Sequence, residues 1–210
     1  RLDPNDALTS QNIGTYYLNS GRFDDASRAF TRAVALDKKC DPALNGLGII
    51  ALSRGDFDTA ERYFSAAIAI NPESDEALYR MGAVTLGRGD YDGAEQWFNR
   101  ALAINPLHSE ALQGLGMIRA RAGDFDTAVT LFEKALAASP GNAELCSMLG
   151  KVLARIERTD DALAYYRKAV ALDSSAMEAY RGMVELYLLR GDRESAQETV
   201  RRAVEANPRS

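Results

Sequence analysis

The residues with the most reactive side chains are few in this chain of 210 residues. The two cysteines, Cys40 and Cys146, are far apart, make no disulfide framework and have no neighbours at the spacing of metal ligands. The single histidine, His108, has no nucleophile or second histidine beside it, and such a histidine is more often a surface residue than a catalyst. The sequence therefore predicts no catalytic residue, no metal site and no cofactor, and we expect that the chain is not an enzyme.

Two other features could suggest chemistry. The segments Gly46-Leu47-Gly48 and Gly114-Leu115-Gly116 look like fragments of a phosphate-binding loop. A dinucleotide fingerprint needs a preceding strand and a βαβ unit, whereas both segments fall inside predicted amphipathic helices. The 30 acidic residues offer many pairs for acid–base catalysis, but most fall at helix caps or on exposed helix faces. We interpret both features as structural.

Composition and charge narrow the class of partner. The chain is 46% apolar and 26% charged, as is ordinary for a globular protein. Its net charge of −5 creates no field that would attract nucleic acid or anionic lipid. No apolar run approaches the roughly 18 residues of a membrane span, and no targeting segment is visible. We expect no nucleic-acid partner and no direct membrane insertion.

The elements that position all these residues come from an internal repeat of 34 residues. Residues 1–6 match the end of a preceding unit, and six units follow at 7–40, 41–74, 75–108, 109–142, 143–176 and 177–210. Alanine recurs at positions 20 and 27 of every unit, and glycine recurs at positions 8 and 15. Position 24 is aromatic in five units, as Phe30, Phe64, Phe98, Phe132 and Tyr166. Each unit therefore predicts two closely packed helices.

The motif Gly-Asp-Phe/Tyr-Asp predicts the joint between the two helices of a unit. The glycine at position 15 provides a left-handed stop, at Gly21, Gly55, Gly89, Gly123 and Gly191. Position 18 is predicted to cap the second helix, through Asp24, Asp58, Asp92, Asp126 and Asp160. Proline at position 32 then ends that helix, as Pro4, Pro72, Pro106, Pro140 and Pro208.

Taken together, these positions resemble the tetratricopeptide repeat family over essentially the whole chain. The resemblance implies an all-α fold, an α-solenoid in which six helix-turn-helix repeats form one right-handed superhelical domain. Some units depart from the family pattern, through Lys38 in unit one, Glu157, Thr159 and Ser174 in unit five, and Val184 and Arg193 in unit six. We expect the same fold in those units, with looser joints.

In tetratricopeptide proteins one side of the first helices lines a concave groove, and the resemblance implies the same here. The predicted ligand-binding residues are Asn45, Ile49, Leu52, Tyr79, Leu86, Gln113, Met117, Arg121, Lys151 and Arg155. This surface is apolar in the early and central units and basic toward the end, which suits a peptide or helix with apolar anchors and acidic groups. The structural alternative is that the leucines pack under the turn, and that Arg121 and Arg155 form solvated surface or a salt bridge to Glu110 or Glu144.

The sequence thus favours a non-catalytic scaffold that binds a peptide or helix of a partner protein. One alternative is a substrate-positioning or assembly array of a larger enzyme, or of a bacterial pilus, secretion or polysaccharide-export machine. Another is end-to-end self-assembly, because Val200 and Val204 leave an apolar edge on the last helix. Tetratricopeptide domains that bind chaperones hold a C-terminal carboxylate with lysine and asparagine at set positions of the repeat. This sequence does not match that set, so a co-chaperone role is not expected. The repeat sequences resemble those of bacterial tetratricopeptide proteins. This resemblance favours a location in the bacterial cytoplasm or periplasm.

Overall fold

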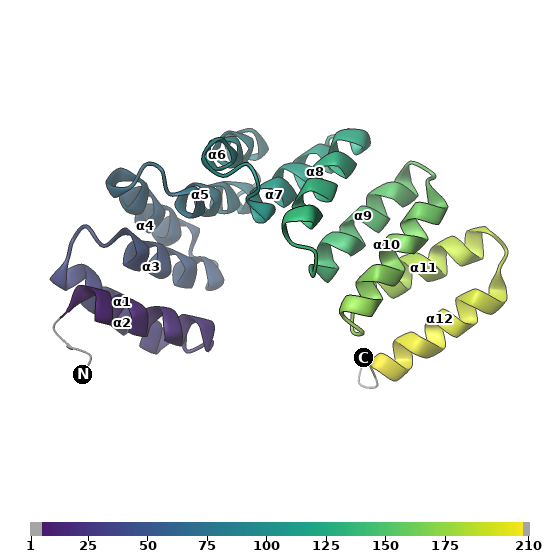
Figure 1. The fold of residues 1–210 in the computed structure, drawn as a ribbon, viewed down its shortest axis with the longest axis horizontal. Helices are drawn as coiled ribbons and strands as arrows, with labels where there is room; N and C mark the ends of the chain where they lie inside the picture. The colour runs from purple at the N-terminus through teal and green to yellow at the C-terminus, as the bar shows by residue number, and fades with distance from the viewer. Residues whose placement is uncertain (1–5, 208–210) are drawn as a thin grey trace. The chain divides into compact units, whose positions relative to one another are not determined.

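The computed structural model describes residues 6–207, which form twelve α-helices in six consecutive pairs (Figure 1). The first helices of the pairs are α1 (Ala7–Asn19), α3 (Asp41–Ser53), α5 (Asp75–Gly87), α7 (Ser109–Arg121), α9 (Ala143–Arg155) and α11 (Met177–Leu189). The second helices are α2 (Phe23–Leu36), α4 (Phe57–Ile70), α6 (Tyr91–Ile104), α8 (Phe125–Ala138), α10 (Thr159–Leu172) and α12 (Arg193–Ala206). Every first helix begins at the first residue of a 34-residue unit, so the predicted all-α helix-turn-helix fold is confirmed.

The chain divides into two compact units, one with α1–α6 that ends at Pro106 and one with α7–α12 that begins at Leu107. In the first unit each helix packs on the next, and α3 also contacts α1 and α5. In the second unit each helix again packs on the next, and α9 also contacts α11. None of the helices within residues 6–207 is both long and apolar enough to span a bilayer.

The turn inside each pair depends on a residue with positive φ, as predicted. The five glycines at position 15 have φ between 70° and 82°. In the fifth pair Glu157 takes the same place with φ of 61°, and it is the one non-glycine residue with positive φ among those the structure describes. The joint therefore keeps its geometry in this pair although the glycine is missing.

The predicted caps of the second helices are wrong by two residues. These helices begin at position 17, so the cap is position 16, and the aspartates at position 18 lie inside the first turn. The backbone N–H of Thr59 donates to the Asp56 carboxylate at 3.0 Å, and this hydrogen bond lowers the pKa of that carboxyl group. Asp90, Asp124 and Asp192 cap their helices in the same way. The aspartates at position 18 still interact favourably with the helix dipole, which explains why the sequence repeats them.

The predicted proline stops are confirmed where the structure describes them. Helices α4, α6 and α8 each end two residues before a proline, at Pro72, Pro106 and Pro140. Pro4 and Pro208, together with most of the expected unit end at residues 1–6, lie outside the described residues.

In five of the six pairs, the core is built by an aromatic ring that lies against a glycine of the first helix. A Cβ atom added at Gly48 would lie 2.5 Å from the ring of Phe64, which is fully buried. A Cβ at Gly46 would lie 2.3 Å from the ring of Phe30 in the preceding pair. The Gly46-Leu47-Gly48 segment is therefore helical and packs against two rings, which confirms its structural interpretation.

Candidate binding site

The two cysteines and the single histidine are buried in the structure. Cys40 and Cys146 are free thiols in buried positions, and burial raises the pKa of both, so they are weak nucleophiles. The expectation that His108 is a surface residue is wrong, because its side chain is buried. His108 is the N-cap of α7, where its Nδ1 accepts a hydrogen bond from the backbone N–H of Ala111 at 3.4 Å. Within residues 6–207, no three His, Cys, Asp or Glu side chains gather as metal ligands would.

A pocket of about 500 Å³ lies in the second compact unit, where α7, α8 and α9 meet. Its apolar surface comes from Met117, Ala120, Phe125, Phe132, Met148 and Val152. Three cationic side chains also line it, those of Arg121, Lys151 and Arg155. The structure therefore brings four of the predicted binding residues together, namely Met117, Arg121, Lys151 and Arg155.

Helix geometry explains why these side chains share one pocket. Met117 and Arg121 are four residues apart on α7, and Lys151 and Arg155 are four residues apart on α9, so each pair occupies one face of its helix. A Cβ at Gly116 would lie 2.5 Å from the ring of Phe132, so the glycine lets this ring approach α7. The pocket is thus formed by regular helices and a tightly packed ring.

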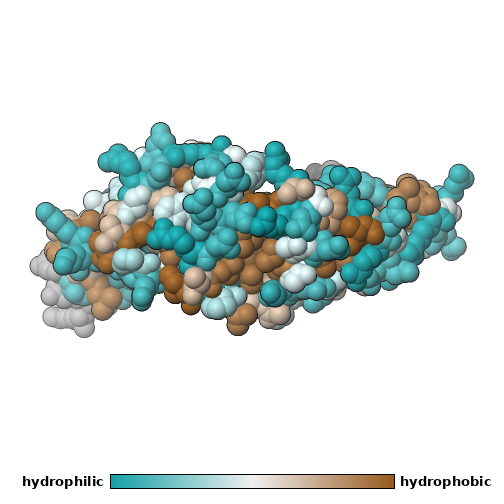
Figure 2. Space-filling view, turned by 90° about the horizontal axis from the view of Figure 1, so that it is seen from above, coloured by the Kyte–Doolittle hydropathy of each residue, from teal (hydrophilic) through white to brown (hydrophobic). Residues whose placement is uncertain are grey.

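The side chains around the pocket differ in exposure. Met117 is 41% exposed, whereas Phe132 is 2% exposed and belongs to the core. Gln113, another predicted binding residue, is half-buried on α7, and its Nε2 lies 3.6 Å from the Sδ of Met148 on α9. Gln113 therefore helps to position Met148, which lines the pocket. Figure 2 shows hydrophobic residues reaching the surface between hydrophilic ones.

The other predicted binding residues lie in the first compact unit and are less accessible. Ile49 and Leu52 are half-buried and pack against the core cluster that contains Phe64, Met81 and Val84. For Leu52 this packing favours the structural alternative, in which the position-12 leucine lies under the turn.

Tyr79, Leu86 and Asn45 are also at least half-buried. The ring of Tyr79 stacks on that of Phe98 with centroids 6.0 Å apart, and the guanidinium of Arg80 lies over Tyr79. Asn45 is only 8% exposed, and its Oδ1 atom has no hydrogen-bond partner among the described residues. These three residues therefore offer a ligand much less surface than the pocket in the second unit.

The predicted set of binding residues does not include the larger apolar side chains of the pocket that come from α8 and from the middle of α9, namely Phe125, Phe132, Met148 and Val152. Phe132 occupies the aromatic position that is core in every unit that has it, and Phe125 is simply the first residue of its helix. No sequence signal separates these residues from their counterparts in other units. Their exposure to a ligand depends on how α7, α8 and α9 pack.

The fold and this site define an α-helical repeat protein with a pocket at the surface. One model of the tetratricopeptide repeat matches residues 12–75, 45–108 and 87–143, and a second model with the same description matches residues 157–210. The chain belongs to the tetratricopeptide repeat family. Proteins of this family are generally protein-interaction scaffolds and are typically non-catalytic.

Solved structures agree with this assignment at the level of the fold. PilF of Pseudomonas aeruginosa has a TM-score of 0.84 and 18% identity, covering 97% of this chain and 93% of that protein. PilW, a type IV pilus biogenesis factor, has a TM-score of 0.84 and 22% identity over 97% and 94% of the two chains. YrrB, a tetratricopeptide protein with an unusual peptide-binding site, has a TM-score of 0.59 and 24% identity over 84% and 91%. A comparison with curated proteins found no match.

Proposed function

We propose that this chain is a non-catalytic scaffold that binds a peptide or helix of a partner protein. The observation that supports this most directly is the pocket between α7, α8 and α9, which combines apolar surface with three cations. Its volume of about 500 Å³ lies within the range of about 300 to 1,000 Å³ that ligand-binding pockets occupy. Apolar anchors supply most of the binding energy in such contacts, and charged groups at the rim orient the partner.

Site-specific photo-crosslinking tests this function. A photoreactive amino acid replaces Met117, and in a second protein it replaces Lys134, an exposed residue of α8 that does not line the pocket. Both proteins are irradiated in a lysate of the source cells, and the crosslinked peptides are sequenced by mass spectrometry. We expect one defined partner segment to be attached at position 117 and not at position 134. Equal labelling at both positions, or no crosslink at position 117, would contradict the proposal.

A second candidate is a part in assembling a bacterial pilus. It is supported by the shared fold with PilF and PilW, each of which matches this chain over nearly its whole length. The same crosslinking experiment tests it, because the sequence of the attached segment identifies the protein from which it comes. A pilus component at position 117 would support this candidate, and a partner unrelated to pili would contradict it.

A further inference from the structure

The pocket between α7, α8 and α9 has a charge opposite to that of the whole chain. The chain has 30 acidic and 25 basic residues and a net charge of −5. The described residues that line the pocket include three cations, Arg121, Lys151 and Arg155, and no carboxylate. Lys151 and Arg155 are exposed, and neither forms an ion pair or side-chain hydrogen bond within residues 6–207. This concentration of positive charge is therefore a local feature of α7 and α9.

Elsewhere in the chain, arginines at the ends of first helices have a structural partner. In three helix pairs an arginine directly follows the last residue of the first helix, and its guanidinium forms an ion pair with an aspartate of the preceding pair. These ion pairs are Arg54–Asp24 at 2.6 Å, Arg190–Asp160 at 2.7 Å and Arg88–Asp58. An arginine at this place therefore helps to join neighbouring repeats.

In α7 and α9 the arginine occurs one residue earlier. Arg121 and Arg155 are the last residues of their helices, and the following positions are Ala122 and Ile156. One residue corresponds to a rotation of about 100° around a helix. This rotation moves the guanidinium from the side of the ion pairs to the side of the pocket. In the repeat numbering, Asp126 of the preceding pair is equivalent to Asp24, Asp58 and Asp160, and Ile156 occupies the position of Arg54, Arg88 and Arg190.

We infer that this pocket binds an acidic peptide segment of a partner protein, with an apolar side chain of the segment against Met117, Met148 and Phe125 and its carboxylates beside Lys151 and Arg155. The inference rests on the proposed function and specifies its ligand. A guanidinium binds a carboxylate through two parallel hydrogen bonds, and an ammonium group binds it as a point charge. The apolar surface favours a peptide over a nucleic acid, because it offers methionine and phenylalanine side chains to an aliphatic or aromatic anchor.

Fluorescence polarisation with a designed probe tests the ligand chemistry. The probe is a fluorescein-labelled nonapeptide with a central leucine and glutamate or aspartate on both sides. A second peptide replaces the acids with glutamine and asparagine, and a third replaces the leucine with serine. We expect the first peptide to bind about tenfold or more tightly than either of the others, with an affinity that falls as salt is added. Equal binding of the three peptides would overturn the inference.

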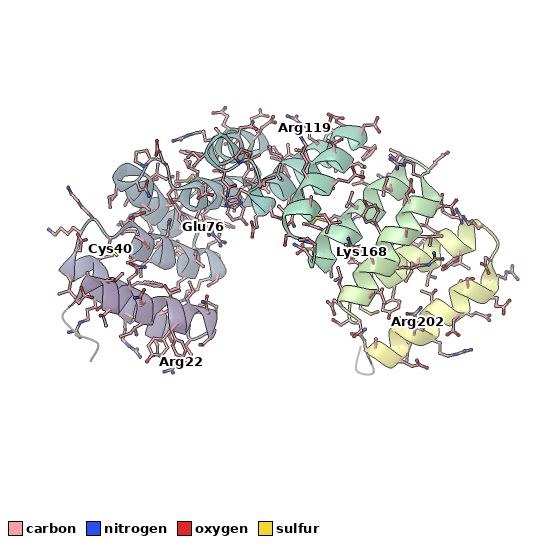
Figure 3. The ribbon with its side chains drawn as sticks, viewed as in Figure 1. Arg22, Cys40, Glu76, Arg119, Lys168 and Arg202 are labelled. Carbon is pink, nitrogen blue, oxygen red and sulfur yellow. The ribbon has the colours of Figure 1, made fainter. Side chains whose placement is uncertain are left out.

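Charge-reversal variants test the assignment of the residues. Lys151→Glu with Arg155→Glu should weaken binding of the acidic probe about tenfold or more, because two attractions become repulsions. The matched control is Lys168→Glu with Arg202→Glu, which changes the same two residue types on α10 and α12 outside the pocket (Figure 3). Circular dichroism melting curves of both proteins come first. An equal loss in the control would show that net charge alone drives binding and would overturn the inference.

A variant of unchanged composition provides a second test that does not depend on net charge. Arg155→Ile with Ile156→Arg moves the arginine to the place that it occupies directly after α3, α5 and α11. We expect the melting temperature to be kept, through a new ion pair with Asp126, and the affinity for the acidic probe to fall severalfold. A folded variant with unchanged affinity would contradict the role of Arg155.

The inference and the proposed function fail in different ways. A crosslink from position 117 to a basic or uncharged partner segment would overturn the inference and leave the scaffold function intact. Competition of a single-stranded oligonucleotide with the acidic probe at equal charge would also overturn it, in favour of a nucleic-acid ligand. The absence of any partner segment at position 117 would contradict the proposed function itself.

Discussion

At the scale of single residues, the turn inside each helix pair shows most directly how backbone conformation constrains the sequence. Five of the six turns use glycine at φ of 70° to 82°, and the fifth pair uses Glu157 at 61°. A left-handed conformation costs an L-residue about 1–2 kcal/mol, because its Cβ approaches the following carbonyl oxygen. Glycine avoids this cost but loses more conformational entropy on folding. The turn in the fifth pair is therefore strained compared with the others.

Replacing Glu157 with glycine should therefore stabilise the protein. We expect Glu157→Gly to raise the free energy of unfolding by about 0.5–1 kcal/mol, since the relief of strain exceeds the added entropy cost. Urea denaturation followed by circular dichroism measures the change. Gly123→Ala is the reciprocal control and should lower the stability by a similar amount, because Gly123 has φ of 82° and open space around it. A less stable Glu157→Gly protein would show that the glutamate side chain contributes a contact that outweighs the strain.

At the scale of helices, small residues determine how closely two elements approach. Alanines at positions 20 and 27 are buried in all six pairs, as the sequence predicts, and the glycine at position 8 lies against the aromatic residue at position 24 in five. These features are readable from sequence because they recur with one period and involve neighbours along the chain. The cap positions were harder to predict, since both position 16 and position 18 carry aspartate in several units and only the backbone shows where the helix begins.

The contact between α3 and α4 gives a quantitative test. Gly48→Ala places a methyl group 2.5 Å from the buried ring of Phe64, so the ring or the helix must move. We expect a loss of about 1–3 kcal/mol in the free energy of unfolding, as is typical of an overpacked core. Gly141→Ala is the matched control, because a Cβ there meets nothing within 4 Å and its φ is not positive. Chemical denaturation of both variants measures the difference, and equal stabilities would show that the packing around Phe64 adapts without cost.

At the scale of the whole molecule, the last helix pair exposes apolar side chains on α12. Within each compact unit a second helix packs against the first helix of the following pair, but no helix follows α12 in the described chain. Val184 and Val200 replace the usual glycine and aromatic residue there, and Val200 and Val204 are 48% and 62% exposed. Pockets of about 350 and 430 Å³ lie beside these residues. An apolar surface of this kind is typical of a contact with another protein or with a second copy.

Self-association through α12 is testable by sedimentation velocity over a range of protein concentrations. We expect the wild-type chain to associate as its concentration rises and the variant Val200→Lys with Val204→Lys to remain monomeric, since two buried charges would be costly at the contact. The control, Ala137→Lys with Ala164→Lys, adds the same charge at exposed positions of α8 and α10. If the wild type is monomeric at every concentration, or if the control also abolishes association, the apolar face does not drive self-assembly.

The sequence alone determined the family, the twelve helices and the turn glycines. This was possible because a repeat protein is stabilised by contacts between neighbouring elements. The residues that make these contacts recur at the same position in several units of the sequence. The accessibility of the predicted binding residues could be read only from the packed helices. Ile49, Leu52 and Asn45 share a helix face with equivalents of the pocket residues, yet they are packed or buried. Met117, Arg121, Lys151 and Arg155 surround a pocket because α7, α8 and α9 leave space there. Periodicity determines the direction of a side chain, whereas the size and exact packing of its neighbours determine whether a ligand can reach it.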